Sequence, residues 1–210
     1  MNQYLIDTKY AASNIIDLIM HDERDLEKAE GRKRQIYEEL KLSYERFYAG
    51  DMSDDISPMQ VQYEYVQLMK HAERLSEQEK HLIVQMESLK NLIDAKLFAV
   101  SSLCGALLQI AKQGISIVHR GLGNCPDGRG IGNEVLKNII WQARNQSIHY
   151  EEGNFRPPVQ QCFQNLEAYF GNEFSLSLHP NENFAQKIVI NILGWNDYQV
   201  YEYDMISILG

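Results

Sequence analysis

The chain has 210 residues, of which 44% are hydrophobic, and a formal net charge of −9. This length accommodates one domain, or one domain with an appended element, and the aromatic content fits a packed core rather than disorder. Non-specific nucleic-acid binding depends on an excess of lysine and arginine. The acidic balance therefore argues against broad RNA binding and indicates no DNA partner, although it leaves room for a local site built from a few arginines.

The three cysteines, Cys104, Cys125 and Cys162, are widely separated and odd in number. The sequence has no Cys-x2-Cys pair and no metal-binding histidine pattern, so we expect free thiols, no metal site and no cofactor. Free thiols suit a reducing compartment. The N-terminus does not resemble a signal peptide, and we expect no membrane span because no run of about 18 apolar residues occurs. These features favour a cytoplasmic protein.

Residues 8–49 are rich in charge and contain no proline, and their apolar residues recur at steps of three and four, which predicts a helix. Its expected apolar face consists of Ile15, Ile16, Leu18, Ile19, Ile36, Leu40, Tyr44, Phe47 and Tyr48. Residues 49–55 have turn-forming composition. Ser57-Pro58 then begins a second helix, with proline at its first position.

The second helix carries a seven-residue hydrophobic repeat. One series comprises Leu75, Leu82, Leu89, Leu103, Ile110 and Ile117, interrupted by Lys96, and the other comprises Met86, Ile93, Val100 and Leu107. Such a seam predicts a long helix packed along partner helices. The favoured partner is the first helix, folded back as an antiparallel hairpin, and a homodimeric coiled coil is the alternative. Because residues 96–118 are almost wholly apolar, we expect a hairpin over 1–95 and a helical core over 96–210, with the second helix continuous across the boundary.

The remaining segments are expected to complete an all-α fold. The glycine-rich residues 121–132 predict a loop, residues 133–152 a helix, and Arg156-Pro157-Pro158 the start of another helix that carries Val159, Phe163, Leu166 and Phe170. Residues 174–210 are ambiguous between helix and strand. We favour two short helices, the second capped by Asn196 with an apolar face of Tyr198, Tyr201, Met205, Ile208 and Leu209.

The most informative motif is Arg144-Asn145, followed by His149 near the end of the 133–152 helix. Asn145 and His149 stand four residues apart and share a helix face, and the long Arg144 side chain can reach the same face. Cleavage of RNA without a metal needs a proton acceptor, a proton donor and stabilisation of the extra charge on phosphorus. Histidine can exchange the protons, and arginine can stabilise the charge through paired hydrogen bonds.

The spacing of Arg144 and His149 resembles the Arg-x4-His signature of HEPN domains, small helical modules that include metal-independent ribonucleases. The resemblance covers residues 96–170 and implies a HEPN-like helical bundle. It also implies a homodimer in which Arg144 and His149 of both subunits line one RNA cleft, with Asn145 setting their geometry. A role as a toxin with an antitoxin partner, or in antiviral defence, is implied by the resemblance alone.

One position departs from the pattern. HEPN toxins that pair with nucleotidyltransferase antitoxins carry tyrosine two positions after the histidine, where this chain has Glu151, with Tyr150 beside the histidine. Control by modification of that tyrosine is therefore not implied.

Weaker candidates for substrate binding are His119, Arg120, Arg129 and Tyr150, with an exposed helix end and a flexible connector as the alternative interpretation. The Arg144–His149 pair itself has an alternative role, because cations also stabilise helix C-termini. The sequence thus predicts a HEPN-type endoribonuclease that cleaves RNA by 2′-OH attack. The alternative is a non-catalytic HEPN-like scaffold that binds a protein partner or a nucleotide.

Overall fold

A computed structural model describes the backbone of residues 2–49 and 58–210, and the side chains of residues 2–42, 70, 77 and 79–210. The chain forms two compact units. The core unit comprises Met1–Glu23 and Phe98–Gly210, and the hairpin unit comprises Arg24–Leu97. Helix α1 (Gln3–Ala49) and helix α2 (Pro58–His119) contribute to both units. The second helix is therefore continuous, as predicted, but the described residues up to Glu23 pack with the core rather than with the hairpin.

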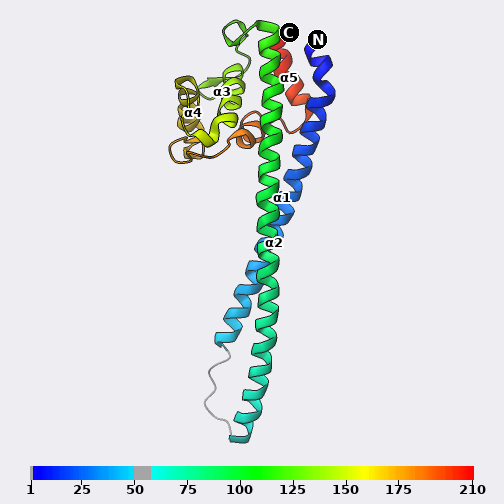
Figure 1. Cartoon of the computed structure of the whole chain (residues 1–210), viewed down its shortest axis with the longest axis vertical. Helices are drawn as coiled ribbons and strands as arrows, with labels where there is room; N and C mark the ends of the chain where they lie inside the picture. Colours follow the sequence, from blue (N-terminus) through cyan, green and yellow to red (C-terminus); the bar gives the residue numbers. More distant parts are fainter. Residues whose placement is uncertain (1, 50–57) are drawn as a thin grey trace. The chain divides into compact units, whose positions relative to one another are not determined.

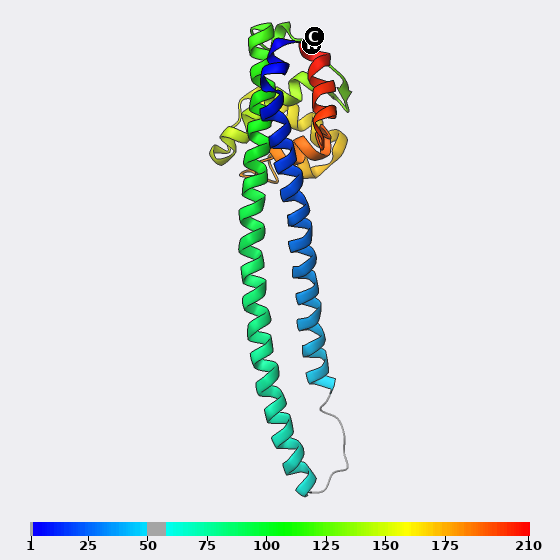
Figure 2. The same ribbon diagram turned by 90° about the vertical axis from the view of Figure 1, so that its right-hand side faces the viewer.

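In the hairpin unit, α1 and α2 lie side by side and run in opposite directions (Figure 2). Their facing sides bury the apolar residues Leu26, Ala29, Ile36 and Ile93. Lys96 Nζ of α2 lies 3.2 Å from Asp25 Oδ2 of α1 and adds an ion pair. The predicted antiparallel hairpin is thus confirmed, while the burial of Leu75, Tyr44, Phe47 and Tyr48 lies outside the described side chains.

In the core unit, the end of α2 is buried along one face against α1. The fully buried residues of these helices are Leu5, Ala12, Ile16, Ile19, Val100, Cys104, Leu107, Leu108, Ala111 and Ile115. The hydroxyl of Tyr4 donates a 2.7 Å hydrogen bond to the carbonyl of Ile110 and fixes the register of the two helices.

Two predicted core positions of α1 and α2 are wrong. Leu18 is 53% exposed because it lies two residues from the buried Ile16, on the opposite side of α1. Ile117 is 64% exposed. A strict seven-residue series drifts around an α-helix by roughly 20° per heptad, so Leu103 and Ile110 are half-buried and Ile117 faces solvent.

The segment after α2 differs from the predicted loop. It forms a short 3-10 helix, η1 (Leu122–Asn124), and a two-stranded antiparallel sheet of β1 (Gly130–Ile131) and β2 (Glu134–Val135). Strands of two residues are too short to leave an alternating hydrophobic pattern, which explains why the sequence gives no sign of them.

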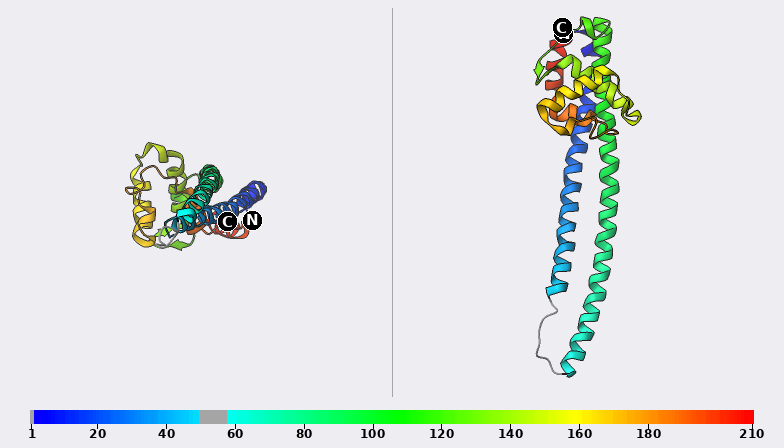
Figure 3. Two further views of the ribbon diagram at one scale, coloured as in Figure 1. Left: turned by 90° about the horizontal axis from the view of Figure 1, so that it is seen from below. Right: turned by 90° about the vertical axis from the view of Figure 1, so that its left-hand side faces the viewer.

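Helix α3 (Leu136–His149) follows β2 and continues into the 3-10 turn η2 (Tyr150–Glu152), which ends at Gly153 in the left-handed conformation, φ 64°. Helix α4 (Pro157–Phe170) starts with its prolines, as predicted. It buries Val159, Phe163 and Leu166, whereas Phe170 is 36% exposed, contrary to expectation. Helix α3 lies against the C-terminal part of α2, and α4 packs against α3 (Figures 1 and 3).

The C-terminal segment is helical, which resolves the helix-or-strand ambiguity. It contains η3 (Asn172–Phe174), the π-helical η4 (Lys187–Ile192) and α5 (Tyr198–Leu209). Asp197 rather than Asn196 caps α5, because its carboxylate accepts a 3.0 Å hydrogen bond from the Val200 amide. Helix α5 lies beside the start of α1 (Figure 1), where Asn2 Nδ2 donates to the Leu209 carbonyl at 3.1 Å. The all-α fold is therefore confirmed.

One stretch of the described residues is long and apolar enough to cross a membrane, judged by length and composition alone. It is Glu79–His119 of α2, with an 18-residue window of mean hydropathy 1.5, of which 28% is buried inside the structure. A candidate thus exists where the sequence analysis expected none. A core helix of a soluble protein passes the same test, so the finding by itself assigns no membrane.

Candidate functional site

The three principal motif residues line one pocket of about 460 Å³ in the core unit. Helix α3 forms one wall, and the segment from η2 to the start of α4 forms the other. The lining residues are Trp141, Gln142, Arg144, Asn145, His149, Glu152, Asn154, Phe155, Arg156, Pro158 and Val159. The left-handed turn at Gly153 reverses the chain, so the residues that follow it run back past the end of α3. For this reason the two walls of the pocket come from neighbouring parts of the sequence.

Arg144 is half-buried and held by two side-chain contacts. Its Nε donates to Oε1 of Gln109 on α2, and its Nη1 donates to Oδ1 of Asn145 at 3.5 Å. Burial lowers the pKa of the guanidinium from its ordinary high value, but arginine stays protonated in proteins. The remaining N–H groups of Arg144 form no hydrogen bond with a described residue, so they can bind a ligand.

Asn145 connects α3 to a lysine that the sequence analysis did not single out. Lys112 Nζ on α2 donates a 3.0 Å hydrogen bond to Asn145 Oδ1, and it lies 4.5 Å from the centre of the Trp141 ring. Burial lowers the pKa of Lys112, and the neighbouring Arg144 charge lowers it further. Two cations thus approach the same amide oxygen.

Neither cation has an anionic partner among the residues that the structure describes. No carboxylate in this part of the chain forms an ion pair with Lys112 or Arg144, although the chain as a whole carries 29 Asp and Glu against 20 Lys and Arg. Unpaired cations in an acidic protein mark a place where an anionic ligand is favoured electrostatically.

His149 lies at the end of α3, and its side chain is 51% exposed. Its Nδ1 lies 2.8 Å from Glu152 Oε1. An ionised carboxylate can only accept a hydrogen bond, so the proton of this contact belongs to Nδ1. The Nε2 atom is then the nitrogen left to exchange a proton with a ligand. The pocket contains both Arg144 and His149, but no hydrogen bond joins them.

The four weaker candidates do not line this pocket. His119 Nε2 donates a 2.6 Å hydrogen bond to the carbonyl of Ile208 and so ties the end of α2 to α5. Tyr150 binds Glu151 at 3.1 Å, and this hydrogen bond raises the pKa of its hydroxyl. Arg120 is exposed in the turn after α2, with a positive φ of 61°. These positions fit structural or surface roles.

Arg129, the fourth weaker candidate, is partly exposed and forms an ion pair with a buried residue of the core unit. Its Nε and Nη2 lie 2.8 Å and 3.0 Å from the two carboxylate oxygens of Asp204, and its Nη2 also donates to the Leu193 carbonyl at 2.7 Å. The Asp204 side chain is only 2% exposed. Arg129 therefore neutralises a buried carboxylate through Nε and Nη2, which gives it a structural role in the core unit.

Lys112, Gln109 and Arg156 are site residues that were not predicted from the sequence. A signal for Lys112 existed, since it is the only charged residue between Lys96 and His119 in a strongly apolar helix segment. A charge in such a segment needs a polar partner. The partner, Asn145, becomes evident only when α2 and α3 are packed together.

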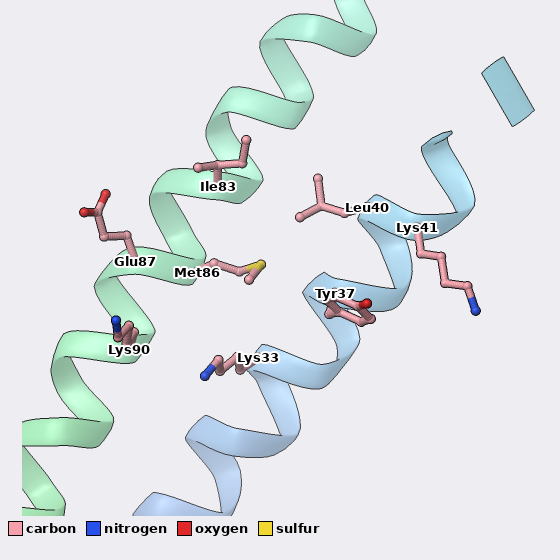
Figure 4. A pocket seen from close by; sticks show the side chains of 8 residues that line it. All are labelled: Lys33, Tyr37, Leu40, Lys41, Ile83, Met86, Glu87 and Lys90. Atoms are coloured by element: carbon pink, nitrogen blue, oxygen red, sulfur yellow. The ribbon is translucent and has the colours of Figure 1, made fainter. Parts of the chain in front are cut away.

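A second pocket lies in the hairpin unit, between α1 and α2 (Figure 4). This interhelical groove of about 750 Å³ is lined by Lys33, Tyr37, Leu40, Lys41, Ile83, Met86, Glu87 and Lys90. Figure 4 shows the apolar side chains of Leu40 and Met86 pointing into the space between the helices. Tyr37 and Ile83 are 59% and 50% exposed, so the groove presents apolar surface with lysines at its edges.

Comparison of the chain with protein-family models, with curated proteins and with solved structures gives no match. The resemblance to HEPN domains therefore rests on the motif residues of α3 alone, and it stays a prediction.

Proposed function

We propose that the protein is a HEPN-type, metal-independent endoribonuclease that cleaves RNA by attack of the 2′-OH. The proposal rests on one observation: Arg144, Asn145 and His149 line the same pocket. It combines unpaired positive charge with a histidine whose Nε2 is free to transfer a proton.

Each residue has a role that fits its contacts. His149 acts as general base or acid through Nε2, while Glu152 fixes its ring through Nδ1. Arg144 binds the phosphate and stabilises the charge that develops on its oxygens. Asn145 accepts hydrogen bonds from Arg144 and Lys112 and so sets the position of both cations.

A single pocket supplies one histidine, whereas 2′-OH cleavage needs both a proton acceptor and a proton donor. A homodimer in which two pockets face one cleft would supply two histidines. The half-exposed side chain of His149 and the open pocket beside it are compatible with such a partner. We therefore include homodimerisation in the proposal, with RNA as the substrate and no metal or cofactor.

The experiment that tests this function uses matched oligonucleotides in EDTA. The protein is incubated with single-stranded and structured RNA and with the same sequences carrying 2′-O-methyl groups. We expect cleavage of the RNA alone, with 2′,3′-cyclic phosphate ends on the products. Cleavage in a parallel reaction with Mg²⁺ but not in EDTA would contradict the metal-independent mechanism. Cleavage of the methylated strand would contradict attack by the 2′-OH.

The interhelical groove supports a second candidate function, that of a HEPN-like scaffold. The charged residues that line it are three lysines and one glutamate, Lys33, Lys41, Lys90 and Glu87. This excess of positive charge favours an amphipathic partner helix with acidic flanks. Under this proposal the protein binds a protein partner, such as an antitoxin, without cutting RNA. An Ile83→Asp variant that loses such a partner while wild type shows no ribonuclease activity would support the scaffold over the enzyme.

We place the protein in the cytoplasm. All three cysteines are free and buried in the structure, which fits a reducing compartment. Toxin or defence activity belongs to the proposal only through the HEPN resemblance.

A further inference from the structure

Lys112 and Arg144 come from two different helices and converge on one oxygen atom. The distances to Asn145 Oδ1 are 3.0 Å from Lys112 Nζ and 3.5 Å from Arg144 Nη1. Asn145 Nδ2 in turn faces Gln142 Oε1 at 3.5 Å, so the amide is oriented with its oxygen toward the cations. The side chains are thus held in place before any ligand binds.

This arrangement is electrostatically unfavourable without an anion. Two positive charges that share a neutral acceptor repel each other, and the repulsion is stronger where water is partly excluded. Burial and the Arg144 charge lower the pKa of Lys112, because both make the charged form of the lysine less favourable. A bound anion would reverse both effects, because it pairs with each cation and favours the protonated form of the lysine.

The hydrogen-bond donors of Arg144 and Lys112 indicate which class of anion the site binds. Arg144 offers a planar fork of N–H groups, and Lys112 offers a compact ammonium with N–H groups beyond the one that binds Asn145. Tetrahedral oxyanions with several oxygens match such a pair. The Trp141 ring lies beside Lys112 and lines the pocket, where an unpaired base next to the phosphate can contact it.

We propose that Lys112 and Arg144 together bind one backbone phosphate of single-stranded RNA, which makes Lys112 a substrate-binding residue contributed by α2. The identity of the ligand rests on the proposed ribonuclease function, whereas the phosphate site itself does not require cleavage.

The test is a binding titration with a fluorescently labelled, single-stranded 2′-O-methyl RNA, which lacks the nucleophile and is not cut. Wild type is compared with Lys112→Gln and Lys112→Arg over a series of KCl concentrations. Lys80→Gln is the matched control, because Lys80 lies on the same helix, is exposed and belongs to the hairpin unit rather than the core unit. Thermal melts of all four proteins show whether the fold is retained.

We expect Lys112→Gln to weaken binding about tenfold or more, as for the loss of a charge-assisted hydrogen bond. The slope of log affinity against log salt should fall by about 0.7, the value for one phosphate contact of a single strand. Lys112→Arg should retain most of the affinity, and Lys80→Gln should bind like wild type. If Lys112→Gln does not fold, Lys112→Met keeps the apolar stem and gives the same comparison.

The binding and cleavage measurements test the phosphate site and the ribonuclease function separately. Equal affinity and equal salt slope for wild type and Lys112→Gln, or no binding by wild type, would overturn the phosphate site even if RNA is cleaved. Lys112-dependent binding without cleavage of RNA would support the phosphate site and reject the ribonuclease.

Discussion

His149 Nδ1 and Glu152 Oε1 lie 2.8 Å apart across the end of α3, so the carboxylate fixes the histidine ring and its tautomer. Glu152→Gln should lower the rate of RNA cleavage by roughly tenfold, because the amide no longer stabilises the charged imidazolium. Glu151→Gln is the control, since Glu151 binds Tyr150 and lies outside the pocket. Equal rates for both variants would mean that Glu152 does not position His149.

A mixing experiment tests whether the site is shared between two subunits. Arg144→Ala and His149→Ala should each be inactive alone, and a re-annealed mixture should recover part of the wild-type rate. A mixed dimer would place one intact arginine and one intact histidine in a common cleft, and the absence of the second histidine limits the recovery to a part of the wild-type rate. If each pocket worked alone, every pocket in the mixture would lack one residue, and no activity would return.

The Arg129–Asp204 ion pair predicts that Arg129 is a structural residue. Arg129→Ala should lower the free energy of unfolding by at least about 2 kcal/mol, because it leaves the buried Asp204 carboxylate without its cation. Arg120→Ala, at an exposed position, should change it by no more than about 0.5 kcal/mol. Chemical denaturation measures both values. An unchanged stability together with lost RNA binding would instead restore Arg129 as a substrate ligand.

Two glycines of α2 give a matched test of packing in the core unit. A Cβ at Gly114 would lie 2.8 Å from Tyr4 Cε1 and 2.9 Å from Leu209 Cδ1, whereas at Gly105 the nearest atom, Ser147 Oγ, would be 3.6 Å away.

Gly114→Ala should therefore destabilise the fold by about 1 to 3 kcal/mol, because α1 and α5 must move away from α2. Gly105→Ala should stabilise it by up to about 1 kcal/mol, because alanine favours the helix. Melting temperatures of the two variants should shift in opposite directions. A shift of the same sign in both would contradict the close contact of Tyr4 and Leu209 with α2.

Much of the fold follows from hydrophobic spacing. The series of Met86, Ile93, Val100 and Leu107 predicted the seam of α2, and the last three are buried. Periodicity failed where the helix geometry drifts from a seven-residue repeat, as at Ile117, and where the elements are too short for any period, as in β1 and β2. Asp204 shows another limit, because a carboxylate in a short amphipathic helix gives no sign that it will be fully buried.

The candidate site was predictable in its local part only. Arg144, Asn145 and His149 follow one another on α3, and helical spacing alone places them near each other. Lys112 and Gln109 belong to another helix, more than 30 residues earlier, and their contact with α3 depends on tertiary packing. Arg129 could be either a ligand or an ion-pair partner until the position of Asp204 was known.

The most direct test of the account is RNA cleavage in EDTA by wild type and His149→Ala, with His81→Ala as the control for an exposed histidine in the hairpin unit. We predict that wild type and His81→Ala cleave RNA at the same rate. His149→Ala should lose activity by about 100-fold or more while its melting temperature stays close to that of wild type. Equal cleavage by His149→Ala, or no cleavage by folded wild-type protein, would contradict the assignment of the Arg144–His149 pocket as a ribonuclease site.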